Sequence, residues 1–499
     1  MEPAGIGSPH AATARVLPLP AVLGIAAAAG AVTFLLSLSQ PFGLSDEALE
    51  YFVGRAFARG EDIFRFGHLG PYLPGQYAWY GSLFALLGDG VWVLRLARAL
   101  LVVAMVAAVA RALSRYASRA VACAAALTIG VVIYASATTF SSGLVVAAAL
   151  GVLAGAAPPS RRGVLGAALL AGFLCGVRED SAVLALGVAC AACWRRRSWR
   201  DLATAVAPGL AAGFAPWLLL FALRGELPGL LAQVGNRFAL MATRVAYPHR
   251  AEWGFSRAAL FASPRSFVIS LLPLAAAVPV LTYAGLLAAQ ALRRRRGAPV
   301  HLPAVVAALA GFAYLPQFFL DRRDLWHLRA HLHVLVAVAA VGIGMLSLRR
   351  QRVAAVLMGC AALVGAAGIL AQHRLADAAA YPCCDGRRIG ATLEGGAPPW
   401  AGFGQGGGTL IVLGYGPGWY AVEGIAPGTR FLMPFDLYLR RAQDRAELIA
   451  DLAAPANRWV IFDGTLAQPA EVTAALARGY VQTQAFRDWR LFARRATGP

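Results

Sequence analysis

Long apolar runs recur from residue 16 to residue 371, and arginine clusters or polar loops separate them. Many approach the ~20 residues that an α-helix needs to cross the ~30 Å hydrocarbon core of a bilayer. The chain of 499 residues is 59% hydrophobic and only 14% charged, whereas about 25% of the residues in a soluble globular protein are charged. The sequence therefore predicts a polytopic α-helical membrane protein and argues against a water-soluble fold.

Eleven apolar segments are predicted to enter the membrane, and in chain order they cover residues 16–38, 91–110, 120–134, 143–157, 163–175, 181–194, 202–223, 266–292, 300–319, 330–348 and 353–371. The third to sixth segments contain only 13 to 15 residues, which is short for a span. Tilted helices packed on protein and hairpins that enter and return both fit that length. If two short segments form a hairpin that does not cross the membrane, the number of spans falls by two. The chain therefore ends on the same side of the membrane in both cases.

The distribution of arginine orients this bundle. The first apolar segment is predicted to remain as a span because no small-residue cleavage site is evident. An N-terminus in the cytoplasm then assigns five loops to that side, which are 111–119, 158–162, 195–200, 293–296 and 349–352. These 28 residues hold 16 Arg and no acid. The opposite loops are 39–90, 135–142, 176–180, 224–265 and 320–329. They hold 13 Arg and 12 acids in 117 residues, so arginine is about fivefold denser inside, as the positive-inside rule requires.

One external loop, 224–265, is itself basic, with six Arg against Glu226 and Glu252. Two interpretations remain open, which are an interfacial helix on anionic lipid headgroups and a basic wall that faces a phosphate. The formal net charge of the chain is +20, but its arginines cluster between apolar segments as topology signals. A nucleic-acid partner is not predicted, because no basic patch interleaved with aromatic residues is present.

The region after residue 371 has a different character and is predicted to be a small extracytoplasmic α/β domain, 372–499, that follows a transmembrane module, 1–371. Strand and helix patterns alternate in TLIVLGYG, DRAELIADLAA, NRWVIFDG, PAEVTAALARGY and WRLFARR. Its GYGPGWY segment lacks the third glycine of a nucleotide-binding turn. Cys383 and Cys384 are adjacent in this region, and their spacing selects no disulfide pairing.

Three acids, Asp46, Glu47 and Glu50, lie where the chain leaves the first predicted span. One interpretation makes them the N-terminal residues of a helix capped by Ser45, where carboxylates complement the helix dipole. The other is catalytic, because a carboxylate that is partly desolvated at a membrane boundary has a raised pKa and suits a general base. Both interpretations are compatible with the sequence.

In this loop the chain resembles the GT-C superfamily of integral-membrane glycosyltransferases, especially the branch of aminoarabinose and protein O-mannosyl transferases. The resemblance follows the order of an acidic pair Asp46-Glu47, an amphipathic helix 51–58, a turn at Gly60, a helix with Pro71 and Pro74, and Arg95 opening the next span. It implies a GT-C-like fold in which the loop 39–90 is catalytic. Asp46 would deprotonate the acceptor hydroxyl, with Glu47 beside it in the motif.

Arg55, His68 and Tyr72 of the same loop are candidate substrate-binding residues. The segment HLGPYLPG replaces the Lys-Pro-Pro-Leu element of the aminoarabinose branch, so the sequence does not identify the sugar. The second external loop, YASATTFSSG, contains no carboxylate. A divalent metal would need two or more convergent carboxylates, so no metal or other cofactor is predicted.

Two further polar segments are candidate substrate-binding sites. FFLDRRDLWHLRAH is either a salt-bridged interfacial turn or a headgroup-binding segment, since guanidinium groups bind phosphate oxygens in a bidentate manner. Its candidate residues are Arg322, Arg323, Asp324, His327 and Arg329. VREDS at 177–181 gives Arg178, which either binds substrate or pairs with a neighbouring acid.

The predicted function is transfer of a sugar from a polyprenyl-phosphate donor to a cell-envelope acceptor, with inversion, at the outer face of a bacterial cell membrane. The sequence contains no Asp-x-Asp, Walker or Rossmann motif, which disfavours a soluble nucleotide-sugar donor. The alternatives are a lipid or solute transporter or flippase and a non-catalytic envelope-assembly protein with the same fold. A transporter would be expected to show inverted repeats, and no repeat is evident.

Overall fold

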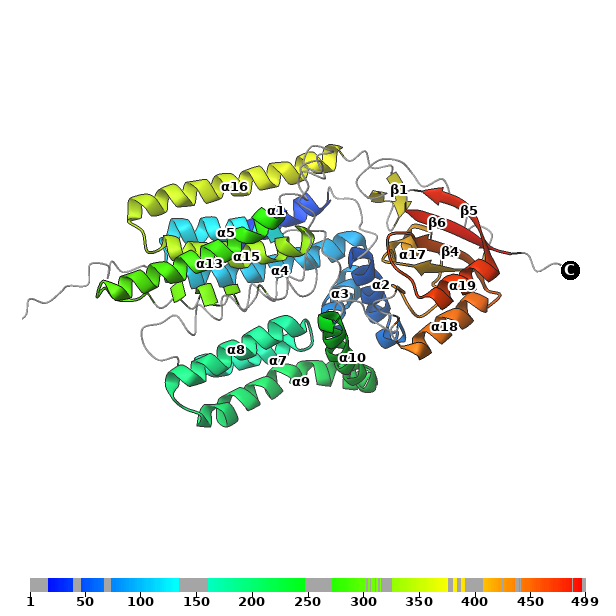
Figure 1. The fold of residues 1–499 in the computed structure, drawn as a ribbon, viewed down its shortest axis with the longest axis horizontal. Coiled ribbons are helices and arrows are strands. Elements are labelled where there is room, and N and C mark those ends of the chain that lie inside the picture. Colours follow the sequence, from blue (N-terminus) through cyan, green and yellow to red (C-terminus); the bar gives the residue numbers. More distant parts are fainter. Residues whose placement is uncertain are drawn as a thin grey trace, which may run out of the picture. The chain divides into compact units, whose positions relative to one another are not determined.

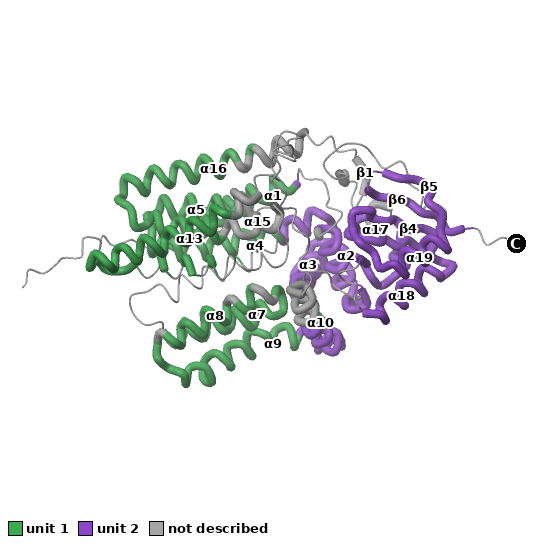
Figure 2. The backbone as a smooth tube through the Cα atoms, viewed as in Figure 1, with its two compact units in different colours: residues 1–37, 98–219, 236–368 green, residues 38–97, 220–235, 369–499 purple. Residues whose placement is uncertain are grey.

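The computed structural model describes residues 17–38, 46–66, 73–133, 160–246, 272–301, most of 304–315, 325–375, 380–383, 387–390, 407–423, 425–435, 439, 441–486 and 488–495. Within these ranges, the side chains of some helical residues, such as Asp46, are outside the description. The chain divides into two units (Figure 2). Unit 1 comprises residues 1–37, 98–219 and 236–368, and unit 2 comprises 38–97, 220–235 and 369–499.

Apolar helices form the membrane part of the chain (Figure 1), because a helix satisfies its backbone hydrogen bonds internally. Their bounds are α1 Leu19–Leu38, α4 Val91–Leu113, α5 Arg119–Ile133, α7 Arg161–Leu174, α8 Glu179–Arg196, the π-helical turn η2 Leu202–Val206, α9 Ala207–Leu223, α13 Leu272–Arg295, α15 Leu325–Ile343 and α16 Leu348–Leu375. The amphipathic helix α10 Leu227–Ala246 lies within the predicted external loop 224–265.

Within the described ranges, three helical stretches are long and apolar enough to cross a membrane, which are Leu19–Leu38, Val91–Leu113 and Leu202–Leu223. Shorter apolar helices cover Arg119–Gly130, Ser181–Trp194 and Val334–Ile343. The predicted segment 143–157 lies outside the described residues. The helical membrane fold is confirmed, and the number of eleven spans stays a prediction.

Small residues let helices of unit 1 approach one another closely. A Cβ atom added to Gly172 in α7 would lie 2.2 Å from the Leu210 carbonyl oxygen, and one added to Gly213 in α9 would lie 2.2 Å from that of Leu169. Backbone contact between α7 and α9 therefore depends on glycine, as is common for helices packed in membranes.

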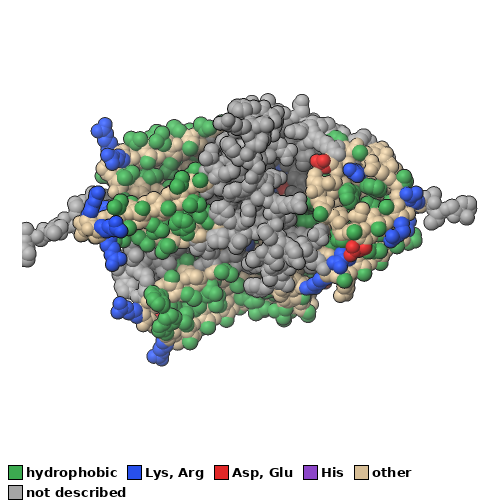
Figure 3. Space-filling model, viewed as in Figure 1, with side chains coloured by type: hydrophobic (Ala, Val, Ile, Leu, Met, Phe, Trp, Pro, Cys, Tyr) green, Lys and Arg blue, Asp and Glu red, His purple; other side chains and the backbone are tan. Residues whose placement is uncertain are grey.

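Arginine-rich loops of unit 1 meet in the structure. The backbone N–H of Ser118, before α5, donates to Gln351 Oε1 at the start of α16 over 2.8 Å. Gln290, near the arginines that end α13, donates to the Met345 sulfur over 3.2 Å. Figure 3 shows arginine side chains projecting from the ends of helices of unit 1, whose lengths are covered by apolar side chains. These three loops, all assigned to the cytoplasmic side from the sequence, therefore lie at one end of their helices.

The first polar loop folds into helices of unit 2, which are α2 Asp46–Ala58, the 3-10 helix η1 Ile63–Phe66 and α3 Pro74–Leu87. Gly60 ends α2 with a φ of +74°, and the N–H of Glu61 donates to the Ala56 carbonyl over 2.9 Å. This is the left-handed helix end that glycine adopts at low cost. The predicted turn at Gly60 is confirmed.

The end of the chain forms a small α/β domain in unit 2, as predicted. Its strands are β3 Thr409–Leu413, β4 Asn457–Asp463, β5 Tyr480–Phe486 and β6 Trp489–Arg494, and its helices are α17 Gly418–Glu423, α18 Ala442–Ala453 and α19 Ala470–Gly479. The sheet order is β3-β4-β6-β5, with β3 and β4 parallel and the other pairs antiparallel. A separate hairpin pairs β1 Ala380–Cys383 with β2 Arg387–Gly390.

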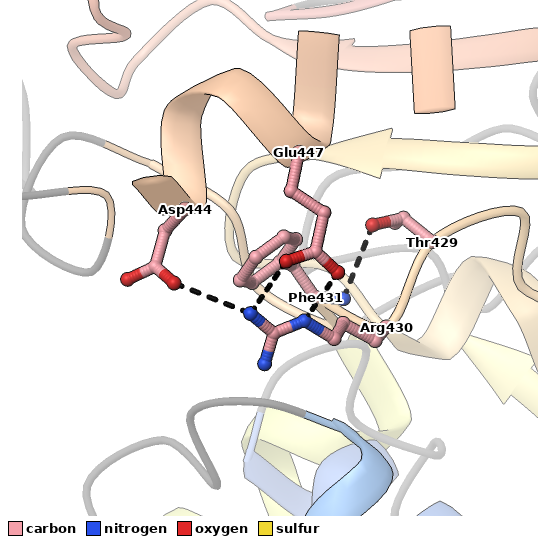
Figure 4. A network of polar contacts seen from close by, with 5 residues as sticks. All are labelled: Thr429, Arg430, Phe431, Asp444 and Glu447. Carbon is pink, nitrogen blue, oxygen red and sulfur yellow. Dashed lines mark hydrogen bonds and ion pairs between the residues drawn. The ribbon is translucent and has the colours of Figure 1, made fainter. Parts of the chain in front are cut away.

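A well-anchored loop covers the outer edge of β3. The N–H of Gly428 donates to the Leu410 carbonyl over 2.7 Å. Two residues on, Arg430 binds Glu447 of α18 through both carboxylate oxygens, at 2.5 and 2.7 Å, and its Nη2 lies 3.3 Å from Asp444 (Figure 4). Such bidentate pairs are the stronger charge-assisted hydrogen bonds. The loop occupies a strand edge that would otherwise be open to pairing with another chain.

Candidate active site on the acidic helix α2

Glycine residues hold α2 directly against α3. A Cβ atom added to Gly81 would lie 2.5 Å from the Phe57 ring and 2.8 Å from the Gly54 carbonyl oxygen. One added to Gly54 would lie 2.9 Å from the Phe84 ring. Tyr51 of α2 is buried and meets Phe84 edge to face, with ring centroids 5.8 Å apart. The acidic start of α2 is therefore fixed relative to α3 by tight packing.

Glu47 lies in the first turn of α2 and forms a buried ion pair with Arg95 of α4. The Nε–Oε1 distance is 3.2 Å, and the two side chains are 12% and 4% exposed. A guanidinium removed from water needs a partner charge, because leaving it alone in a low-dielectric site costs several kcal/mol. The Arg95 that the resemblance places at the start of the next span is thus the residue that holds Glu47.

Glu50 is the most buried acid of the motif, at 1% exposure. Its Oε1 accepts a hydrogen bond of 2.6 Å from Nε2 of Gln76 in α3. Glu47 and Glu50 are therefore both engaged by neighbouring helices. Gln76 was not identified from the sequence, because a single amide in an apolar helix gives no signal of its own.

Arg55, a predicted substrate-binding residue, lies at the other end of α2. Its Nε is 2.7 Å from the Asp89 carboxylate, and its guanidinium lies 5.1 Å from the centre of the Tyr51 ring. Arg59 also reaches Asp89, at 3.2 Å. Two arginines share one carboxylate here, so this end of α2 has excess positive charge.

Arg224 links the end of α2 to the start of α10. It donates to the carbonyl oxygens of Phe57 and Glu61 over 3.1 and 2.9 Å and pairs with Glu226 at 2.8 Å. Burial raises the pKa of Glu226, an effect that the hydrogen bond and charge of Arg224 oppose and that nearby Asp62 reinforces. The sequence showed Arg224 only as one of six arginines in a basic loop. It is engaged with protein groups in the structure.

The C-terminal domain contacts the same helix. α17 packs on α2, where the Tyr420 and Phe52 rings meet edge to face with centroids 6.1 Å apart. The Tyr420 hydroxyl accepts a hydrogen bond of 3.0 Å from the N–H of Val412 in β3. Burial raises the pKa of Tyr420, so its hydroxyl stays protonated. A chain of contacts thus links β3, α17 and α2, which sequence patterns did not predict.

The structure describes only some of the other predicted site residues. Asp46 begins α2, and its side chain is outside the description. Arg178 precedes α8 in unit 1 and is half-buried. His327 and Arg329 lie in α15 without described side chains, whereas the following residues lie outside the described part of the chain: His68, Tyr72, Arg322, Arg323 and Asp324. Glu47 and Arg55 lie on the same helix, at opposite ends of α2.

Among the described residues, no group of three or more His, Cys, Asp or Glu side chains is arranged to hold a metal ion. The absence of a metal at the complete site stays a prediction.

The described elements run from an apolar first helix through the acidic α2 and the proline-initiated α3 to a long helix with a buried arginine. The chain has a GT-C fold over nearly its full length. It superposes on the crystal structure of ArnT, an aminoarabinose transferase, from Cupriavidus metallidurans bound to undecaprenyl phosphate, with a TM-score of 0.52 and 15% identity over 96% of this chain and 99% of that one. No family model and no curated protein matches the sequence.

Proposed function

We propose that the chain is a membrane glycosyltransferase that moves a sugar from a polyprenyl-phosphate donor to a cell-envelope acceptor at the extracytoplasmic face. The observation that carries this proposal is the ArnT-like fold over 96% of the chain, combined with an acidic helix directly after the first apolar helix. Fold alone does not define function, so the residues of α2 carry the chemical part of the argument.

Asp46 acts as the general base in this proposal. It begins α2, where the helix dipole favours an ionised carboxylate, and it would take the proton from the acceptor hydroxyl as that oxygen attacks the anomeric carbon. Glu47 and Glu50 are positioning residues, because Arg95 and Gln76 already engage their carboxylates. One displacement without a covalent intermediate inverts the configuration at the anomeric carbon.

The donor is a lipid phosphate. ArnT was crystallised with undecaprenyl phosphate, and the sequence of this chain supplies several basic residues that suit such a group. Guanidinium groups stabilise the negative charge that develops on the departing phosphate. The residues assigned to substrate binding are Arg55, His68, Tyr72, Arg178, Arg322, Arg323, Asp324, His327 and Arg329.

The orientation follows from the arginine-rich loops. Loops before α5, after α13 and before α16 meet at one end of their helices, which supports their common assignment to the cytoplasm. The polar loop 39–90 and the C-terminal domain then lie outside. A single cysteine introduced at position 400, in a variant whose seven native cysteines are replaced, should react with a membrane-impermeant thiol reagent in intact cells, and labelling only after lysis would refute this orientation.

The catalytic assignment is tested by purifying the wild-type protein and Asp46→Asn and measuring transfer from radiolabelled polyprenyl-phosphate sugars to cell-envelope extracts. We expect Asp46→Asn to lose about two to four orders of magnitude in rate, the usual contribution of a general base. Glu61→Gln is the matched control, because Glu61 is a half-buried acid in the same loop whose carboxylate pairs with Arg65. Equal transfer by wild type and Asp46→Asn would rule out the base, and no transfer by the wild type would contradict the proposed activity.

A further inference from the structure

The carboxyl ends of β3 and β4 lie side by side, because the two strands are parallel neighbours. Ligands of α/β proteins commonly bind outside the carboxyl ends of parallel strands. Here, β3 is followed by the short sequence GYGP and then by α17, which begins at Gly418. Since α17 packs on α2, this end of the sheet points toward the helix that carries the acidic motif.

Asp463 ends β4 and is only 6% exposed. Its Oδ1 accepts hydrogen bonds from the N–H and hydroxyl of Thr465, at 2.9 and 2.6 Å. No donor to Oδ2 is present among the described residues. An ionised carboxylate accepts about four hydrogen bonds, and the described residues supply two of them.

An aromatic side chain stands beside this carboxylate. Trp489 is the direct partner of Asp463 in the antiparallel pair of β4 and β6, and side chains of directly opposed residues lie on the same face of a sheet. Trp489 is half-exposed and meets the buried Trp419 of α17 edge to face, with ring centroids 5.8 Å apart. The packing on Trp419 fixes the orientation of the Trp489 ring.

Glycines allow the loop after β3 to run against both side chains. Gly414 has a φ of +146°, and a Cβ atom there would lie 2.4 Å from Cβ of Asp463. A Cβ atom on Gly416 would lie 2.5 Å from the Trp489 ring. The backbone of this loop therefore touches the carboxylate and the indole together, which brings its own N–H and carbonyl groups to the same place.

A carboxylate beside an indole favours one class of ligand. The carboxylate accepts hydrogen bonds from hydroxyl groups, and the electron-rich face of an indole attracts the C–H face of a sugar ring. Glycine-rich loops commonly bind phosphate. Here a phosphate would be repelled by the negative charge of Asp463. The site thus suits a polyhydroxylated neutral group.

We propose that Asp463 and Trp489 bind a neutral sugar unit of the acceptor glycan at the carboxyl ends of β3 and β4. As a statement about the acceptor, it rests on the proposed function above. Because β3 connects through α17 to α2 by the contact between Tyr420 and Phe52, the bound glycan would be held within the unit that carries the acidic motif. The C-terminal domain would therefore contribute to the choice of acceptor.

The test measures binding without donor or transfer. Full-length protein in detergent micelles is applied to an array of immobilised bacterial envelope oligosaccharides. We expect the wild type to retain at least one oligosaccharide, and Asp463→Asn and Trp489→Leu to weaken that binding at least tenfold. Asp463→Asn keeps an oxygen that can accept from Thr465, so the turn is preserved. Glu471→Gln, which removes an exposed acid from the same domain, is the matched control and should bind as the wild type does.

Retention of no oligosaccharide by the wild type, or unchanged binding by both variants, would overturn the inference. Unfolding curves of each variant identify any that are misfolded, and Trp489→Phe, which keeps an aromatic ring, should restore part of the binding lost in Trp489→Leu. Asp46→Asn should bind like the wild type. Binding of glycan by wild-type protein that transfers no sugar would refute the proposed function and leave the glycan site intact.

Discussion

The guanidinium of Arg95 lies 3.2 Å from the carboxylate of Glu47, with both side chains almost entirely removed from water. The two residues are 48 positions apart in the sequence, on helices α4 and α2. The ion pair therefore joins the acidic motif to a helix that is long and apolar enough to cross the membrane. In the proposed mechanism, Glu47 is a positioning residue that aligns the start of α2.

Removing either partner should destabilise the protein. We expect Arg95→Gln to lower the free energy of unfolding by about 3 to 5 kcal/mol, because the buried carboxylate of Glu47 loses the guanidinium with which it pairs. Glu47→Gln should cost a similar amount. Thermal unfolding in detergent measures both, and the double variant should be less unstable than the sum of the single variants, because it buries no lone charge. Additive losses would contradict direct coupling between the two residues.

The pH dependence of stability should carry a contribution from Glu226. Burial raises its pKa above the ordinary 4.5. The protonated carboxyl therefore contributes stability that is fully present below the ordinary pKa and is lost as the pH rises through the raised folded pKa. We expect the melting temperature of the wild type, relative to that of Glu226→Gln, to fall as the pH increases from 4 through the raised pKa of Glu226 toward 7.

Glu471 provides a control of the opposite sign. A hydrogen bond from its own backbone N–H, and then one from Arg445, hold the pKa of Glu471 below its ordinary value. Its contribution is therefore present above the ordinary pKa and is lost as the pH falls through the lowered one. The melting temperature of the wild type relative to Glu471→Gln should rise with pH over the same range. If the difference in melting temperature between wild type and variant changed with pH in the same direction for Glu226→Gln and Glu471→Gln, the assignment of opposite effects to these two carboxyls would be wrong.

The sequence predicted those features that depend on local pattern. Apolar runs gave the helices of the membrane part, and alternating patterns gave β3, α18, β4, α19 and β6, because strand and helix periods differ along the chain itself. β5 was not predicted, since the centre of its sequence YVQTQAF is polar and the strand is exposed at the edge of the sheet. Pairing with β6, rather than the local sequence pattern, makes this segment a strand.

Long-range contacts were beyond the sequence patterns. The adjacent acids Asp46 and Glu47 indicated the start of α2. The ion pair between Glu47 and Arg95 depends on how α2 packs against α4. Arg224 binds the carbonyl oxygens of Phe57 and Glu61, and no spacing in the sequence reveals a side chain that caps a helix from 163 residues away. The boundary predicted at residue 371 remains a prediction, although unit 2 combines residues 369–499 with 38–97.

Gly81 should not tolerate a side chain. A Cβ atom there would lie 2.8 Å from the backbone oxygen of Gly54, which cannot move without shifting α2. We expect Gly81→Ala to destabilise the protein by about 1 to 3 kcal/mol, as overpacking does, and to reduce transfer because α2 is displaced. Gly235→Ala is the matched control in α10, where a Cβ atom would meet nothing within 4 Å. That variant should gain up to ~1 kcal/mol from helix propensity, and equal unfolding temperatures for the two variants would contradict the close α2–α3 contact.

The contact between Phe52 and Tyr420 should determine how firmly α2 is held by the C-terminal domain. Phe52→Ala removes an edge-to-face ring pair worth about 1 kcal/mol and leaves the interior of the domain unchanged. Tyr420→Phe keeps the ring but removes the acceptor for the Val412 N–H, at a cost of about 1 to 3 kcal/mol. Amide hydrogen exchange separates the two effects. Phe52→Ala should speed exchange in α2 more than in β3, and Tyr420→Phe should do the reverse, whereas an unchanged α2 in Phe52→Ala would show that α17 does not restrain the acidic helix.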